Sequence, residues 1–213
     1  LFNEGYKASV GQRLIREELC FEAIRLTELL AAHAAGNRPR SHALLALMFL
    51  NAARLPARTD AEGNILRLNE QDRSHWDKPM IARGMFHLAQ SANGAEISAY
   101  HLQAGIAACH CAAREAKATD WRQILSLYGR LVELDDSPIV ALNRAVAVAN
   151  VHGPAAGMAA TKSLRGRKEL QSYYLLYAVL GEFEAQLHRP QAAANYFRQA
   201  LKQTGTTSEQ HLL

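Results

Sequence analysis

The stretch NEQDRSHWD, residues 69–77, concentrates charged and aromatic side chains in a short segment. The charged and aromatic residues of this stretch are Glu70, Asp72, Arg73, His75, Trp76 and Asp77. Carboxylates close to a histidine are the groups that general acid–base catalysis uses. One hypothesis is therefore an enzyme or a small-molecule sensor whose pocket joins Glu4, Asp72 and His75.

The same stretch also fits the start of a helix. Asn69 can act as the N-cap, and the acids of the first turn would then lie at the positive end of the helix. Arg73 and Asp77 are four residues apart, so they can pair on one helix face. Trp76 would anchor the helix start in the core. If these roles are right, the segment is a structural lock: it fastens the preceding loop to the core. A third interpretation is that the segment forms an interaction surface.

The sequence Cys109-His110-Cys111 suggests a metal site, but its spacing argues against one. Residues two apart on a helix point about 200° away from each other, so both thiolates cannot easily bind one ion. Cys109 shares an apolar stripe with Leu102 and Ile106, which predicts that it belongs to the core. The chain has no P-loop, HExxH, GxSxG or GxGxxG motif. We therefore expect no catalytic residue, metal or cofactor.

Composition indicates a globular protein with a mildly basic surface. Of the 213 residues, 49% are hydrophobic and 21% charged, and the net charge is +4. Acids and bases alternate through most of the chain, as on a solvated surface, so we expect no direct contact with nucleic acid. Three cysteines form no disulfide framework and favour a reducing cytoplasm. No apolar run reaches the roughly 18–20 residues of a membrane span, so we expect no membrane partner.

Helical periodicity dominates the chain. Ser9 with Gln12 fits a capping box for the first long helix, which Gly36 would end. Further helices are expected at about 40–55, 71–90 and 97–117. Another is expected to start at Thr119 or Asp120 as N-cap and to run to about Leu134, and the next starts at Pro138 with Ser137 as N-cap. The helix at 40–55 is apolar all round and should be central. Residues 57–69 predict an irregular loop or a small β-hairpin.

The last third of the chain has the pattern of a tetratricopeptide repeat, in which small residues let two antiparallel helices approach each other. The residues at the motif's spacing are Leu180, Gly181, Ala193, Phe197 and Ala200. The expected fold is all-α: a tetratricopeptide-like array of antiparallel helix pairs in a right-handed superhelix. We expect a single helical domain over 1–213, irregular over 1–136 and with degenerate helix pairs over 137–204.

Three segments together resemble one family. They are FNEGY near the start, ARLPARTDAEGNILRLNEQDRSHWD, and SPIVALNRAVAVANVHGP. In this order they are similar to the C-terminal extension of bacterial extracytoplasmic-function sigma factors of the sigma-70 class. The resemblance covers 1 to about 203, and the chain is therefore expected to be an excised C-terminal piece without the DNA-binding domains. His75 and Ala52 depart from the family pattern, which has Arg and Asp at these places.

The resemblance implies a regulatory, protein-interaction domain that acts in transcription initiation in the bacterial cytoplasm. The implied partners are the sigma-factor DNA-binding domains, the RNA polymerase core and a regulatory protein. We expect Glu4 and Asp72 to pair with Arg54, Arg58 or Arg73. A scaffold without a specific site is the remaining alternative. The candidate interaction or lock residues are Asn3, Glu4, Tyr6, Arg54, Arg58, Gln71, Asp72, Arg73, Trp76, Asn143 and Arg144.

Overall fold

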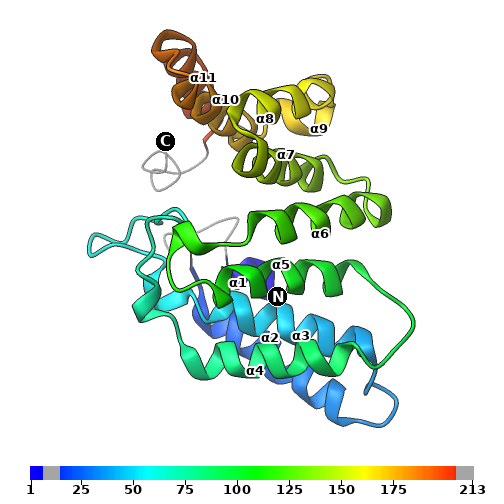
Figure 1. Cartoon of the computed structure of the whole chain (residues 1–213). Coiled ribbons are helices and arrows are strands. Elements are labelled where there is room, and N and C mark those ends of the chain that lie inside the picture. Colours follow the sequence, from blue (N-terminus) through cyan, green and yellow to red (C-terminus); the bar gives the residue numbers. More distant parts are fainter. Residues whose placement is uncertain (7–14, 205–213) are drawn as a thin grey trace. The chain divides into compact units, whose positions relative to one another are not determined.

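The computed structural model describes residues 1–6 and 15–204, and this part of the chain is all-helical (Figure 1). Within it the only β pairing is an isolated antiparallel bridge between Thr59 and Ile65. The expected all-α fold is confirmed. The chain divides into two compact units, Leu1–Thr119 and Asp120–Leu213. The single domain expected from the sequence stays a prediction.

The first unit is built around one buried helix. Its helices are α1 (Phe2–Tyr6), α2 (Glu17–Ala32), α3 (Pro39–Ala52), α4 (Lys78–Ser91) and α5 (Ala99–Ala112). Helix α3 packs against α2, α4 and α5. Its residues Leu45, Phe49 and Leu50 are almost completely buried. This confirms that the all-apolar segment forms the centre, because a helix that is apolar on every side loses least when it is enclosed.

The helix expected from about residue 71 begins seven residues later. Asp77, rather than Asn69, is the N-cap of α4, and its carboxylate accepts a hydrogen bond from Met80 N at 2.8 Å. Asp72 instead caps a short 3-10 turn, η2 (Arg73–His75). The predicted cap at Asn69 was wrong because two later acids compete for the same role, and Pro79 fits only the first turn of α4.

The other helix boundaries agree more closely with the sequence. Helix α2 ends at Ala32, and its expected start at Ser9, with the capping box to Gln12, lies outside the described residues. In the second unit, Asp120, one of the two predicted caps, accepts a hydrogen bond from Gln123 N at 2.9 Å at the start of α6 (Trp121–Leu134).

The rest of the second unit consists of short helices that pack in sequence order. They are α7 (Pro138–His152), α8 (Pro154–Ala160), α9 (Lys168–Gln171), α10 (Tyr174–Gln186) and α11 (Pro190–Gln203). Ser137 takes the predicted N-cap position of α7, but its side chain makes no capping bond. Among the described helices, none is long and apolar enough to cross a membrane.

Small residues permit the close helix packing that the repeat pattern predicted. A Cβ atom at Gly181 would lie 2.8 Å from the ring of Phe197, so only glycine lets α10 and α11 approach this closely. A Cβ atom at Gly157 of α8 would lie 2.6 Å from Ala149 Cβ and 2.9 Å from the ring of Phe183. The small-residue positions of both helix pairs are thus set by contact with a neighbouring helix.

Candidate functional site

The FNEGY motif is joined to the start of the 57–69 loop by a buried arginine. Arg58 Nη1 donates to the backbone oxygen of Tyr6 at 2.7 Å, and its guanidinium carbon lies 3.6 Å from the centre of the Tyr6 ring. Arg58 is only 8% exposed, and this burial lowers the pKa of its guanidinium. The cation–π contact partly replaces the water that burial removes. Arg58 therefore connects two segments that are far apart in sequence.

Gly5 of the same motif is required by a close approach of α1 to α2. A Cβ atom there would lie 2.7 Å from both Arg16 O and Cys20 N. The backbone of Gly5 also accepts a hydrogen bond from Arg16 N at 2.8 Å. The FNEGY motif thus combines a glycine for packing with an aromatic ring that receives an arginine.

The 57–69 segment is an ordered loop. Asp60 Oδ1 accepts hydrogen bonds from Asn64 N at 2.7 Å and Glu62 N at 3.1 Å, and Asp60 Oδ2 accepts one from Asn64 Nδ2 at 3.0 Å. These bonds, with the side chain of Asn64 first, lower the pKa of Asp60. Gly63 supplies the left-handed conformation of the turn, with φ +85°. The Asp60 and Gly63 of the motif therefore have local structural roles.

A buried amide holds the end of this loop against α3. Gln71 is 6% exposed and donates from Nε2 to Leu66 O at 3.1 Å. Its Oε1 accepts a hydrogen bond from Arg54 Nε at 3.4 Å, and the Arg54 guanidinium lies 5.7 Å from the Trp76 ring centre. Trp76 itself is 3% exposed, which confirms it as the anchor of the segment in the core.

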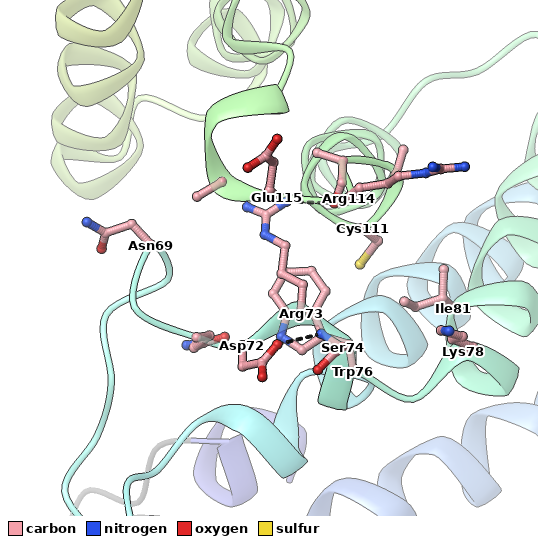
Figure 2. Close-up of a pocket in the computed structure, with 14 residues that line it drawn as sticks. Asn69, Asp72, Arg73, Ser74, Trp76, Lys78, Ile81, Cys111, Arg114 and Glu115 are labelled. Atoms are coloured by element: carbon pink, nitrogen blue, oxygen red, sulfur yellow. Dashed lines mark hydrogen bonds between the residues drawn. The ribbon is translucent and has the colours of Figure 1, made fainter.

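Arg73 connects the same segment to the end of α5. Its Nη1 donates to His110 O at 2.8 Å and Ala113 O at 2.9 Å, and its Nη2 donates to Thr119 Oγ1 at 3.1 Å. Figure 2 shows the Arg73 side chain extending from the 69–78 segment toward the segment that carries Arg114 and Glu115. Its guanidinium carbon also lies 4.9 Å from the Trp76 ring centre. The last carbonyls of a helix lack partners within the helix, so a cation is well placed there.

Two expected ion pairs are wrong. Arg73 does not pair with Asp77, because the chain between them is a 3-10 turn and each side chain has other partners. Asp72 pairs with no arginine of the described ranges 1–6 and 15–204: its Oδ1 accepts from Ser74 N at 2.9 Å, and its Oδ2 lies 3.9 Å from His75 Nδ1. Hydrogen bonding to Ser74 lowers the pKa of Asp72. Asp72, Ser74 and His75 are exposed and form an outward polar edge.

A half-open groove of about 730 Å³ lies between residues 69–78 and residues 111–116 (Figure 2). Its apolar lining includes Trp76, Ile81 and Cys111, and Asp72 is on its rim. Neither Glu4 nor His75 lines this groove, so the expected pocket that joined them to Asp72 is not this one.

Burial keeps the ionisable side chains at the end of α5 in their uncharged forms. Burial raises the pKa of the Cys111 thiol to about 11, so this thiol is protonated at neutral pH. Burial, with the charges of Arg54 and Arg73, lowers the pKa of His110 to about 4. Cys109 is half-buried, and no group of three or more His, Cys, Asp and Glu side chains in the described part could hold a metal ion.

The structure gathers most of the candidate residues but leaves some apart. In the first unit, one network of contacts joins Arg54, Gln71, Trp76 and Arg73. Tyr6 and Arg58 form a separate pair in the same unit. Asn3 and Glu4 belong to α1, where Asn3 is exposed and Glu4 half-buried. Asn143 and Arg144 lie on α7 in the second unit, Asn143 exposed and Arg144 half-buried.

Sequence reasoning missed the segment that receives Arg73, residues 110–119, of which residues 111–116 line the groove. These residues act there mainly through backbone oxygens and through the Thr119 hydroxyl, which accept from Arg73. Every residue has a backbone oxygen, so the residue types do not show which of these oxygens accept a hydrogen bond. The end of a predicted helix is the only sequence signal that could have indicated them.

Comparison with known proteins adds a family match for the first part of the chain. Residues 1–92 match the model of a family described as a family of unknown function (DUF6596). The chain is 37% identical over 209 residues to an uncharacterized protein of Rhizobium meliloti (strain 1021), covering 98% of this chain and 49% of that protein. It therefore spans about half the length of the curated relative that it matches. No solved structure matches the chain. The match to the family of unknown function includes FNEGY, the ordered loop and the segment with Arg73, and excludes the α5 end that Arg73 contacts.

Proposed function

We propose that this chain is a regulatory, protein-interaction domain of an extracytoplasmic-function sigma factor, acting in transcription initiation in the bacterial cytoplasm. The order of its three motifs supports the proposal. The Rhizobium meliloti relative has about as much chain outside the match as within it, which is room for DNA-binding domains in a protein of this kind. The domain would contact protein, either those DNA-binding domains, the polymerase core or a regulatory protein.

The observation that carries the interaction role is the ordered polar edge beside the groove. Arg58 and Arg73 direct their hydrogen bonds to backbone oxygens and their flat faces to aromatic rings, and so fix the two ends of the 58–73 segment. Asp72, Ser74 and His75 stay exposed at the end of this segment. A surface that is ordered before binding loses less conformational entropy when a partner docks. The exposed edge and the adjoining apolar groove together have the polar rim and apolar centre of a protein interface.

The test is promoter-specific transcription in vitro with the full-length factor and with a form truncated before Leu1. A regulatory domain changes the transcript yield when it is removed. Within the full-length factor, Asp72→Asn removes the charge but keeps an oxygen for Ser74 N, and His75→Ala removes the imidazole. Both are expected to change transcript yield while the melting temperature stays constant, and Glu62→Gln on the same loop serves as the exposed control.

Equal transcription from the truncated and full-length factors would refute the proposal. Yield that follows the melting temperature in every variant would refute the docking role of the edge and leave these residues with a structural role.

The groove also supports a second candidate, the sensing of a small molecule. An apolar lining with a few polar groups at the rim is typical of small-molecule sites, and about 730 Å³ is within their usual size. Trp76 lies in this lining and reports on the groove by its fluorescence once the other tryptophan is removed as Trp121→Phe. A saturable change with a metabolite, lost in Ala112→Phe, which fills the groove without adding a tryptophan, would favour the sensor over the docking domain.

A further inference from the structure

The groove has an uneven distribution of charge. Three cations line it, Arg73, Lys78 and Arg114, against two carboxylates, Asp72 and Glu115. Arg73 is already bonded to backbone oxygens and Asp72 to Ser74 N. Lys78 and Arg114 are exposed and form no ion pair with any described residue. They are therefore available to a negatively charged group from outside.

The two available cations border the apolar part of the groove. In the view of Figure 2, Lys78, Ile81 and Arg114 lie to one side of Arg73, and Asn69 lies to the other. The positive field also reaches the α5 wall, because Arg54 and Arg73 both act to lower the pKa of Cys111 against the effect of burial. A ligand that places an apolar group on this lining brings its neighbouring groups close to Lys78 and Arg114.

The opposite end of the groove offers a different kind of contact. The exposed side-chain amide of Asn69 provides both a donor and an acceptor, which matches a peptide group. Glu115, the one carboxylate not engaged in a cap, lines the groove too and would repel a ligand that is acidic throughout. These contacts favour a chain segment with one localised acidic group over a uniformly anionic ligand such as a nucleic acid.

We propose that the groove binds a protein segment in which an apolar side chain lies within a few residues of Asp or Glu. The apolar side chain occupies the lining formed by Ile81, Cys111 and Ala112, and the carboxylate meets Lys78 and Arg114. This assignment rests on the proposed docking function and specifies the chemistry of the partner. Its binding is salt-dependent, because both cations are exposed.

The probe is a phage-displayed library of random 12-residue peptides, selected on the immobilised chain. Selection on the wild type is expected to enrich peptides with Leu, Phe or Trp close to Asp or Glu. An enriched peptide, synthesised with a fluorophore, should bind the Lys78→Glu/Arg114→Glu variant at least tenfold more weakly. The matched control, Lys162→Glu/Lys168→Glu, makes the same charge change at exposed positions of the second unit and should bind as the wild type does.

A second variant tests the groove without changing charge. Ala112 is exposed and lines the groove, so Ala112→Trp fills it and should also weaken the peptide at least tenfold. Circular dichroism melts confirm that each variant is folded. The inference is overturned if no peptide is enriched, if enriched peptides are neutral or basic, or if either groove variant binds as the wild type does. Transcription that depends on the domain without any peptide enrichment would refute this inference alone, whereas equal transcription with and without the domain would refute the proposed function.

Discussion

Removal of the Arg73 guanidinium tests whether the 69–78 segment is held in place by the end of α5. Arg73→Met is the sharpest substitution, because methionine keeps an unbranched apolar stem against Trp76 and loses all three hydrogen bonds. Arg73→Lys keeps the charge, but an ammonium cannot reproduce the fork that spans His110 O, Ala113 O and Thr119 Oγ1.

The expected effect follows from the number and kind of the lost contacts. A hydrogen bond from a charged donor contributes about 1.5–3 kcal/mol net, and the cation–π contact about 0.5–1 kcal/mol at a partly exposed site. Arg73 is only half-buried, and water can replace some of its bonds after truncation. We therefore expect Arg73→Met to lower the free energy of unfolding by about 2–4 kcal/mol and Arg73→Lys by about half as much.

Urea unfolding followed by Trp76 fluorescence measures this loss directly. In a Trp121→Phe background Trp76 is the only tryptophan, and it contacts the residue being changed. With an m-value of about 2 kcal/mol/M, the expected loss shifts the midpoint by about 1–2 M. Arg25→Met is the matched control, because Arg25 forms an exposed pair with Glu22, and its midpoint should stay at the wild-type value.

A midpoint for Arg73→Met within about 0.3 M of the wild type would contradict the reasoning, since it would mean that the three bonds are replaced by water at no net cost. Equal midpoints for the Met and Lys variants would show that the charge retained by lysine does not contribute to stability, which would contradict the expected half-sized loss for Arg73→Lys.

Two further predictions test packing and pH dependence. Gly5→Ala should lower the free energy of unfolding by about 1–3 kcal/mol, because its methyl group would lie 2.7 Å from Arg16 O. Gly129→Ala should raise the free energy of unfolding by about 0.5–1 kcal/mol, because Gly129 lies in helix α6 with open space around it. Thermal melts measure both variants, and equal effects would contradict the prediction. The pKa of His110 is lowered to about 4, mainly by burial, so the unfolded chain binds a proton that the folded chain does not. The contribution of His110 to the free energy of unfolding should therefore be fully present above pH 6.5 and be lost, by on the order of 3 kcal/mol, as the pH falls from 6.5 to 4. His110→Gln should make the free energy of unfolding, measured by urea titration, less dependent on pH over this range. An unchanged pH dependence in the variant would mean that other groups cause the loss of stability.

The expectations that succeeded depended on local pattern. The apolar segment at 40–55 is the central helix α3, and Asp120 caps α6, because periodicity and capping act over a few residues. Gly181 and Phe197 meet as the repeat spacing predicted. The expectations that failed concerned which polar partner a side chain takes. Helical spacing predicts a pair between Arg73 and Asp77, and Asp72 was expected to pair with an arginine. Arg73, Asp77 and Asp72 have other partners, because the helix begins only at Lys78.

The residue types left the 57–69 segment open between an irregular loop and a small β-hairpin. The residue types and their order were sufficient to establish the all-α class, the buried role of Trp76 and the two helix pairs that need small residues. Each of these follows from contacts within one element or between sequence neighbours. The partners of Arg58 and Arg73, by contrast, are backbone oxygens of Tyr6, His110 and Ala113, tens of residues away. Every residue carries such an oxygen, so the residue types do not distinguish these acceptors. The folding of α1 and α5 against the loop selects them, and that packing creates the groove and its exposed polar edge.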